Sequence, residues 1–295
     1  MAFDTSYLYF RAYFGVPSTF RSADGHPVNA VRGTADFMAR LIGQYSPSLV
    51  AAAWDDDWRP GWRVDLVPTY KTHRLDEFGE EAVEEDLSRQ VPWIREALEA
   101  VGVPIVGAAE HEADDVLGSL AKQHAGASLI VTGDRDLFQL ADDRTSVVYI
   151  ARSVPKHDLV TRDFLLEKYG LTPGRYIDFS VLRGDPSDGL PGVKGIGEKS
   201  AALLVEQYPS LDAMIDAARD PDSPLKPAMR RNLLADPDYL AKARKVVESV
   251  VDLALPPVEM KPVDWDAVEA LSERLALGGS LRRLGQALES AAGVQ

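Results

Sequence analysis

The residues of this chain that are best suited to chemistry are aspartates and glutamates, most of which follow short apolar runs. They are Asp4, Asp55, Glu112, Asp114, Asp115, Asp134, Asp136, Asp185 and Asp188. Carboxylate oxygens are the ligands that hard divalent cations such as Mg²⁺ and Mn²⁺ prefer. Two such ions about 4 Å apart can activate a water, hold a phosphate and neutralise the leaving oxygen. The acids therefore predict a site with two or more divalent ions that hydrolyses phosphodiester bonds.

Each acid by itself has a simpler explanation, because an acid after a strand is most often a turn residue or a helix N-cap. A gathering of several acids is harder to explain. Two carboxylates about 4 Å apart repel by about 4 kcal/mol at an effective dielectric constant of about 20, so such a cluster needs cations or shared protons. The chain has no cysteine and no G-x-S-x-G segment, so no protein nucleophile is evident.

The composition indicates a self-sufficient globular protein. Its 295 residues, 45% of them hydrophobic, are enough for one large core or for a larger and a smaller domain. The lack of cysteine excludes disulfides and thiolate metal sites, and it favours a reducing compartment. No apolar run approaches the roughly 18 residues of a membrane span, and the first residues do not resemble a signal peptide. We therefore expect a cytoplasmic monomer without membrane contact.

The net charge of −14 argues at first against a nucleic-acid partner, because phosphate binding draws on clustered lysine and arginine. The basic residues, however, form islands. These are Arg59, Arg63, Lys71 and Arg74, and further along Lys194, Lys199, Lys226, Arg230 and Arg231. The overall charge therefore decides little about the partner.

Short apolar runs alternate with helical patterns through the first two-thirds of the chain. The runs bounded by turn residues predict buried strands at 48–54, 103–106, 128–132 and 146–150. Apolar residues at helical spacing predict helices at 31–44, 87–101 and 114–124. This alternation predicts an α/β fold with a parallel sheet and helices on both faces.

From about residue 163 the strand patterns stop and only helical patterns remain. They predict helices at 163–169, 174–183, 198–208, 211–218, 226–234, 239–250, 264–277 and 281–291. The glycine- and proline-containing segment 170–174 is a natural joint. We therefore predict two domains, an α/β domain at 1–170 and an all-helical domain at 171–295.

The predicted sheet explains how distant acids could meet. In an open α/β sheet, the ligand site lies beyond the carboxyl ends of the strands. Asp4 follows the opening Ala2-Phe3, and Asp55 follows the strand that ends at Trp54. The later acids follow the strands at 103–106 and 128–132. Four strands would therefore deliver carboxylates to one edge of the sheet.

A glycine-rich segment, residues 182–201 (LRGDPSDGLPGVKGIGEKSA), combines two acids with a hairpin that leads into a helix. An ordinary helix-turn-helix corner would also explain it. The glycines Gly192, Gly195 and Gly197 permit a tight turn that leaves backbone N–H groups free to meet phosphate, with Lys194 and Lys199 beside them. No strand precedes the segment, which argues against a dinucleotide-binding fingerprint. The segment is thus a candidate for holding duplex phosphates without reading sequence.

Five segments resemble the bacterial and phage 5′ nucleases, or flap endonucleases, a family that includes the 5′ nuclease domain of bacterial DNA polymerase I. They are residues 8–17 (LYFRAYFGVP), 70–74 (YKTHR), 110–121 (EHEADDVLGSLA), 131–140 (VTGDRDLFQL) and 182–201. The resemblance implies a PIN-like (resolvase-like) sheet with a helical arch at about 57–95. It also implies a C-terminal all-α domain that carries a helix-three-turn-helix at about 182–208.

The resemblance further divides the acids into two metal sites. It implies a first site near Asp4, Asp55, Glu112 and Asp114. It implies a second site near Asp114, Asp115, Asp134, Asp136, Asp185 and Asp188. The ions would be Mg²⁺ or Mn²⁺, and backbone carbonyls of the helix-three-turn-helix could hold a K⁺ ion.

Basic and aromatic residues gain roles from the same resemblance. Tyr70, Lys71 and Arg74 would belong to the arch, where the two cations steer the scissile phosphate and the tyrosine stacks on a nucleotide. Arg11 would contact phosphate, and Ser200 would join the phosphate contacts of the hairpin. The acidic run 76–86 is expected to be a solvated helix or a disordered part of the arch.

The implied function is structure-selective 5′-3′ exonuclease and 5′-flap endonuclease activity on branched or 5′-ended duplex DNA. Such an enzyme would act in DNA replication and repair near the nucleoid, with functional links to DNA polymerase I and ligase. Two alternatives stay open, an RNA-directed PIN-like nuclease and a non-catalytic module that binds DNA junctions. The glycine hairpin favours branched DNA over RNA, and the complete set of acids favours catalysis.

Two positions depart from the family pattern. Asp4 is followed by Thr5, where the family usually has glycine, and only three residues precede it. Because strands are typically five or six residues long, we expect the natural start to lie a few residues upstream. Gly189 stands where the family commonly has asparagine, and we expect only a local effect.

Overall fold

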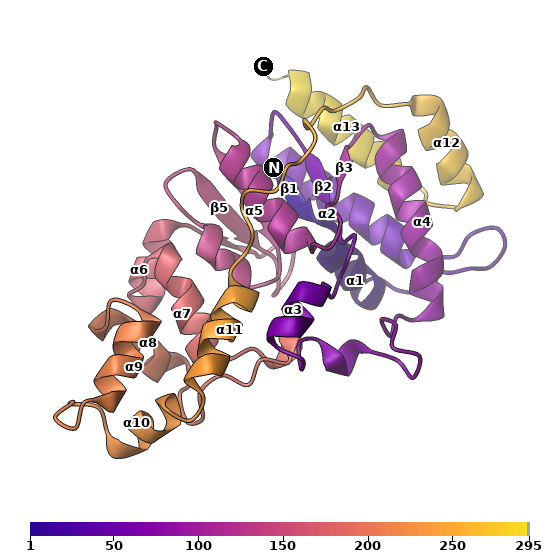
Figure 1. Cartoon of the computed structure of the whole chain (residues 1–295). Coiled ribbons are helices and arrows are strands. Elements are labelled where there is room, and N and C mark those ends of the chain that lie inside the picture. Colours follow the sequence, from indigo (N-terminus) through magenta and orange to yellow (C-terminus); the bar gives the residue numbers. More distant parts are fainter. Residues whose placement is uncertain (294–295) are drawn as a thin grey trace.

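The computed structural model describes residues 1–293 and contains a six-stranded sheet covered by helices on both faces (Figure 1). The strands are β1 (Ala2–Asp4), β2 (Ala51–Ala53), β3 (Ile105–Val106), β4 (Ser128–Thr132), β5 (Thr145–Tyr149) and β6 (Asp158–Val160). Their order is β3-β2-β1-β4-β5-β6, with β1 to β5 parallel and β6 antiparallel to β5. The predicted α/β fold is confirmed. The sheet is mixed because of β6, whose three residues are too few to predict a strand.

The two faces of the sheet follow from the alternation of side chains along each strand. Phe3, Ala52, Val131 and Val148 occupy paired positions of four neighbouring strands and share one core. That core includes side chains of α1 (Thr5–Gly15), α2 (Asn29–Tyr45) and α4 (Glu85–Ala100). On the other face, residues such as Ile130 pack with α5 (Ala113–Gln123) and α7 (Pro173–Arg183).

The position of β1 fixes where a ligand site can form. β1 is central and pairs with β2 on one side and with β4 on the other. The strand order reverses here, so the connections leave in opposite directions and open a crevice at the carboxyl ends of the strands. Asp4 closes β1, and Asp134 follows β4 by two residues. The topology therefore brings these two acids to one crevice.

The helices that follow the sheet lie close to their predicted positions. α6 (Arg162–Tyr169) has Thr161 as its N-cap, whose hydroxyl accepts the Phe164 N–H at 3.2 Å, and Gly170 as its C-cap, which adopts the left-handed conformation. The next helices are α7, α8 (Glu198–Gln207), α9 (Leu211–Arg219), α10 (Pro227–Leu233) and α11 (Pro237–Val247). Each of these helices starts within two residues of its prediction.

The last two helices do not belong to this domain. α12 (Trp265–Arg274) and α13 (Ser280–Gly293) lie beside α4 and α2, at the other end of the molecule from α8, α9 and α10 (Figure 1). Their leucines Leu271, Leu281 and Leu288 share a core with Phe3. The prediction of one helical domain at 171–295 is therefore wrong for its last part, because an irregular strap at 248–264 carries the chain back to the α/β domain.

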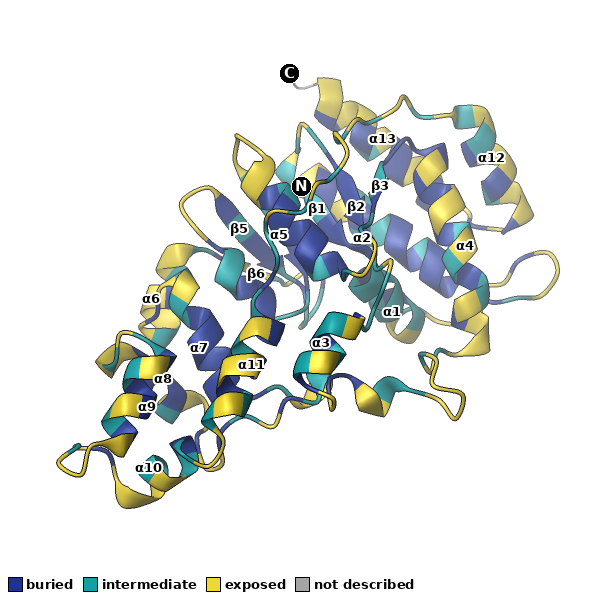
Figure 2. Ribbon diagram, viewed as in Figure 1, coloured by how far each residue is buried: buried dark blue, intermediate teal, exposed yellow. Residues whose placement is uncertain are grey.

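The predicted arch region is mostly irregular. It contains α3 (Gly61–Leu66), one 3-10 turn (Thr72–Arg74), a loop and the first part of α4. Residues 76–80 are exposed (Figure 2), and a bridge between Leu75 and Glu81 closes the loop. Of the two alternatives expected for residues 76–86, the solvated helix is therefore wrong for residues 76–84, since α4 begins only at Glu85. No helix among residues 1–293 is long and apolar enough to cross a membrane.

Candidate active site

A cleft of about 760 Å³ lies at the carboxyl ends of the strands. Six of the nine predicted acids line it: Asp4, Asp55, Glu112, Asp114, Asp134 and Asp185. Lys71 and Arg74 of the arch region line it as well. The structure therefore brings together acids that are up to 181 positions apart (185 minus 4) and places these two cations, and Arg135, among them.

Asp4 and Asp55 are held by hydrogen bonds at the ends of their strands. Asp4 is the N-cap of α1, and its Oδ1 accepts the Tyr7 N–H at 3.0 Å, while Oδ2 accepts the Thr132 hydroxyl at 2.7 Å. Asp55 accepts the N–H of Ala113, the first residue of α5, at 2.7 Å. Both acids thus satisfy helix N-termini and still face the cleft.

The position of the acids that follow β4 depends on Gly133, which lets the chain pack against Tyr7. A Cβ atom at Gly133 would lie 1.8 Å from the Tyr7 ring, so only glycine permits this packing beside Asp134. Oδ1 of Asp134 accepts the N–H of Asp136 at 2.7 Å. Asp136 points away from the cleft lining and accepts the Ser180 hydroxyl of α7 at 3.0 Å. It therefore lies behind Asp134, next to the helical domain.

The loop at residues 185–189 (DPSDG) packs against the arch region. Arg74 donates to Asp188 Oδ1 at 2.9 Å, and the Lys71 N–H donates to the Asp188 carbonyl at 2.9 Å. Gly189 has φ +71°, and a Cβ atom there would lie 2.3 Å from the Thr69 carbonyl. Glycine at this position thus has a structural reason, which is close contact with the arch region.

Glu112 is the cleft acid that contacts two basic side chains and a tyrosine hydroxyl. Its Oε1 accepts Arg63 Nη1 at 3.0 Å and the Tyr70 hydroxyl at 2.8 Å, and its Oε2 pairs with the Lys71 ammonium. Lys71 is a buried lysine with φ +50°, a conformation that non-glycine residues rarely adopt. Strained backbone of this kind concentrates at functional sites.

Burial and the charges of neighbouring carboxylates make these acids harder to ionise. Burial, followed by the charge of Asp55, raises the pKa of Asp4 to about 6. Burial and the charge of Asp134 raise the pKa values of Asp114 and Asp136 well above the usual range. Bound protons or cations therefore stabilise the cluster.

The donor set fits hard divalent cations, because seven carboxylates line the cleft and their repulsion favours positive charge. Within residues 1–293, however, no three acidic or histidine side chains surround one point closely enough to hold an ion as they stand. Lys71 and Arg74 instead neutralise Glu112 and Asp188. An ion would have to draw the carboxylates together and replace these pairings.

Three predicted roles do not fit the structure. Asp115 does not line the cleft, because both its oxygens bind Arg63 at 2.8 Å on the far side of α5. Tyr70 is 4% exposed and packs in the core, so its ring cannot stack on a nucleotide in this arrangement. Arg11 donates to the Ala151 carbonyl at 2.8 Å and does not line the cleft.

The glycine hairpin has the predicted form. Gly192 and Gly195 have positive φ values, and Gly197 is the N-cap of α8. Ser200 Oγ accepts the Gly197 N–H at 3.1 Å, so this serine caps the helix. Lys194 and Lys199 are both exposed. Two cations and a helix N-terminus thus face solvent together, as phosphate binding requires.

The cleft has an aromatic wall that was not predicted. Tyr7, Phe10 and Phe14 of α1 line it, and Phe14 is 73% exposed. Their spacing of three and four places them on one face of a helix, so the pattern LYFRAYF could have revealed them. The sequence shows Arg63 only as one member of a basic island. Its buried role had no signal in the sequence, because its partners lie some 50 residues away.

A second cavity, of about 550 Å³, lies near the amino ends of the strands and the strap. Its lining, which includes Leu49, Leu120, Leu129 and Leu255, has no acidic or basic side chain except His124. It lacks groups for hydrolytic chemistry, so we assign the candidate site to the acidic cleft.

Comparison with known proteins gives matches over nearly the whole chain. Residues 1–170 match the family described as 5′-3′ exonuclease, N-terminal resolvase-like domain, and residues 171–270 match its C-terminal SAM fold. A 5′-3′ exonuclease of Streptomyces coelicolor is 48% identical over 96% of this chain and 98% of its own. A 5′-3′ exonuclease of Mycobacterium tuberculosis is 41% identical over 98% of each chain. A DNA polymerase I of the same species is 33% identical over 99% of this chain and 32% of the polymerase.

Solved structures share the fold at low sequence identity. The T5 D15 protein crystallised with metal ions matches with a TM-score of 0.65 and 19% identity, over 99% of this chain and 98% of the other. The catalytic core of Rad2 in complex with a DNA substrate matches with a TM-score of 0.66 and 17% identity, over 99% and 92%. By its matched domains and its relatives, this chain belongs to the 5′-3′ exonuclease family.

Proposed function

We propose that the protein is a structure-selective 5′-3′ exonuclease and 5′-flap endonuclease that hydrolyses DNA phosphodiesters with divalent metal ions. One observation carries the proposal. Seven carboxylates from six chain segments line one cleft, together with Lys71, Arg74 and Arg135. Membership of the 5′-3′ exonuclease family supports the reaction class.

The acids would hold the ions in two groups. We assign Asp4, Asp55, Glu112 and Asp114 to a first site. We assign Asp114, Asp134, Asp136, Asp185 and Asp188 to a second. Mg²⁺ or Mn²⁺ suits such oxygen ligands, and when bound the ions would supply an activated water and neutralise the leaving 3′ oxygen. A K⁺ ion at the glycine hairpin belongs to the same proposal.

The chain's own residues would position the DNA. Lys71 and Arg74 face the cleft and pair with Glu112 and Asp188. Once ions neutralise these carboxylates, both cations are free to hold the scissile phosphate. The hairpin at 192–200 would grip the duplex through Lys194, Lys199 and backbone N–H groups. The substrate is therefore held at two places, by its cut strand and by its duplex.

The cell setting follows from this reaction. We propose that the protein acts in the cytoplasm as a monomer, on branched or 5′-ended duplex DNA in replication and repair. Gaps and nicks left by flap removal are substrates for a DNA polymerase and a ligase, so these are its expected functional partners. The bacteriophage T5 D15 flap endonuclease, whose structure with DNA and metal ions shares this fold at 18% identity, supports the choice of substrate.

A cleavage assay tests the proposal against both alternatives. A labelled 5′-flap DNA duplex with Mn²⁺ should be cut near its junction, and the product should carry a 5′-phosphate. An RNA flap of the same sequence should be cut more slowly. Asp134→Ala should abolish cutting, whereas Asp143→Ala, which changes an exposed acid paired with Arg162, should not. Binding without cutting would favour a junction-binding module, and faster cutting of RNA would favour an RNA-directed nuclease.

A further inference from the structure

We propose that Arg63 is a positioning residue that orients Glu112 from behind the cleft, and that Asp115 acts only through Arg63. The inference deepens the proposed function, because it concerns the same acidic cleft. It also gives Asp115 a different role from the metal ligation that the family resemblance implies. Neither residue lines the cleft.

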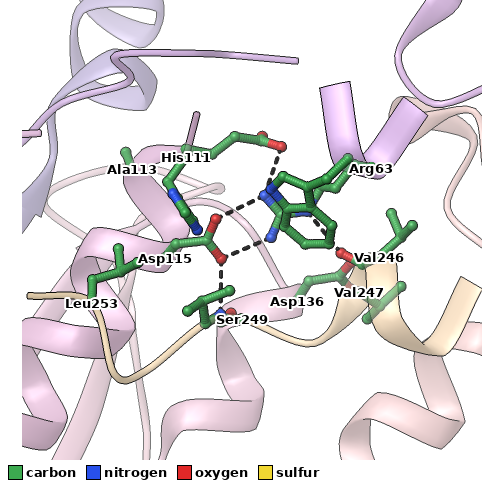
Figure 3. A network of polar contacts seen from close by, with 12 residues as sticks. Arg63, His111, Ala113, Asp115, Asp136, Val246, Val247, Ser249 and Leu253 are labelled. Carbon is green, nitrogen blue, oxygen red and sulfur yellow. Dashed lines mark hydrogen bonds and ion pairs between the residues drawn. The ribbon is translucent and has the colours of Figure 1, made fainter. Parts of the chain in front are cut away.

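The guanidinium of Arg63 joins three parts of the chain (Figure 3). It is 3% exposed at the start of α3, and its Nη1 donates to Glu112 Oε1 at 3.0 Å. Its two Nη groups donate to the two oxygens of Asp115, each at 2.8 Å, and its Nε donates to the Val246 carbonyl at 3.1 Å. A planar fork of donors is needed to reach these acceptors together.

Both carboxylate oxygens of Asp115 accept hydrogen bonds within this network. It is fully buried, and its Oδ1 also accepts the N–H of Val250 at 2.8 Å. Figure 3 shows its carboxylate facing Arg63 and the strap around Ser249. Asp114 and Asp115 are consecutive on α5, where adjacent side chains point about 100° apart. Asp114 therefore faces the cleft, while Asp115 faces Arg63.

The network leaves Glu112 with one fixed and one available oxygen. Oε1 is held by Arg63 and the Tyr70 hydroxyl, both on the buried side. Oε2 is directed to Lys71, which lines the cleft. Without Arg63 the carboxylate would lose its strongest fixed donor and could rotate. Metal ligands that lose such a supporting partner typically bind their ion about 10- to 100-fold more weakly.

The same network ties the helical domain to the cleft. Val246 lies in the last turn of α11. The strap that follows is attached to α5 by a hydrogen bond from Ser119 Oγ to the Val250 carbonyl at 3.2 Å. Gln139 donates to the Val247 carbonyl at 2.8 Å and accepts the Ser249 N–H at 3.0 Å. Arg63 thus sets Glu112 relative to both domains.

The test uses a double variant, because Arg63→Met alone leaves Asp115 unpaired in the core and can prevent folding. Arg63→Met combined with Asp115→Asn removes both charges, which buried pairs usually tolerate. The readouts are Mn²⁺ binding by electron paramagnetic resonance and flap-cleavage kinetics. The double variant should bind Mn²⁺ at least about 10-fold more weakly and lose kcat by a similar factor. Its KM for the flap should stay within about twofold of the parent value, and its Tm near that of the parent. Parental Mn²⁺ affinity in the folded double variant would overturn the role of Arg63.

Two further variants separate the roles. Asp115→Asn alone should bind as many Mn²⁺ ions as the parent, whereas Asp134→Asn, a proposed ligand, should bind fewer. Loss of an ion in Asp115→Asn would overturn the inference that Asp115 acts through Arg63. Arg63→Lys keeps the charge but not the planar fork of donors, so its Mn²⁺ affinity should stay well below that of the parent. Parental Mn²⁺ affinity in Arg63→Lys would contradict the claim that the fork is needed.

A control and the parent protein complete the design. Arg162→Met removes an exposed arginine that pairs with Asp143 at 3.0 Å and should change nothing. If the parent fails to cut DNA while the Mn²⁺ results hold, the proposed function fails and the inference stands. If the parent cuts DNA but the double variant binds Mn²⁺ normally, only the inference fails.

Discussion

Asp4→Asn should stabilise the metal-free protein at neutral and alkaline pH. Burial and the nearby Asp55 raise the pKa of Asp4 to about 6 from a usual value of 3.8. A raised carboxyl pKa means that the native state binds the proton more tightly than the unfolded state. The associated stability is fully present below about pH 4 and is lost as the pH rises through about 6. Above that range the parent protein holds a buried charge that asparagine would not carry.

The size of the effect follows from the shift. A change of about 2 pKa units corresponds to about 3 kcal/mol at 1.36 kcal/mol per unit. Asparagine can still accept the Tyr7 N–H, but its amide nitrogen cannot accept the Thr132 hydroxyl that Oδ2 of Asp4 accepts, which costs about 1 kcal/mol. The net gain of about 2 kcal/mol should raise the Tm by about 4 °C in a chain of this size.

Thermal unfolding followed by circular dichroism in EDTA measures this directly. The Tm difference between Asp4→Asn and the parent should be near zero or negative at pH 4.5 and positive by about 4 °C at pH 8. Millimolar Mn²⁺ at pH 8 should reverse the order, since the ion stabilises the native parent more than the variant. Asp24→Asn, at an exposed position, should show no pH-dependent difference. A difference between Asp4→Asn and the parent that does not change with pH would refute the electrostatic reasoning.

Two further predictions concern the loop that contacts the arch and the duplex-binding hairpin. Gly189→Ala should lower the free energy of unfolding by roughly 2 to 3 kcal/mol, from left-handed backbone strain and from the contact with Thr69. Gly170→Ala, with φ +70° and open space, should lose only the strain part, about 1 kcal/mol, so equal losses in thermal melts would contradict the contact. Lys194→Ala combined with Lys199→Ala should weaken duplex binding and reduce the salt slope of the binding constant by about 2. Fluorescence anisotropy at several salt concentrations checks this, and an unchanged slope would exclude both lysines from phosphate contact.

The sequence predicts the sheet and the helices well where the pattern is local. The β4 strand at 128–132 is apolar and bounded by turns, and the structure begins and ends it at the predicted residues. Residues 265–293 show why domain membership is harder. The pattern of an amphipathic helix predicts that one face is apolar, but it does not predict which core buries that face. Only the path of the strap at 248–264 decides this.

In the candidate site, too, the sequence predicts the features that depend on local pattern and misses those that depend on distant contacts. That the acids share an edge follows from their places after parallel strands, and the structure gathers six of them. Which of two neighbouring acids faces the cleft depends on the rotation of α5, and the partner of Asp115 lies 52 residues away at Arg63. Such long-range pairing leaves no local pattern, which is why Asp115 could not be separated from Asp114 by sequence.

The central claim is that divalent ions bound by the cleft acids cut DNA. The most direct measurement is the single-turnover cleavage rate of a 5′-flap duplex across a Mn²⁺ series, for the parent and for Asp134→Asn. We predict no cleavage by the parent in EDTA, a rate that rises more steeply than the first power of Mn²⁺ concentration, and a variant without activity at any concentration. Cleavage at the same rate in EDTA, or by Asp134→Asn, would contradict the claim.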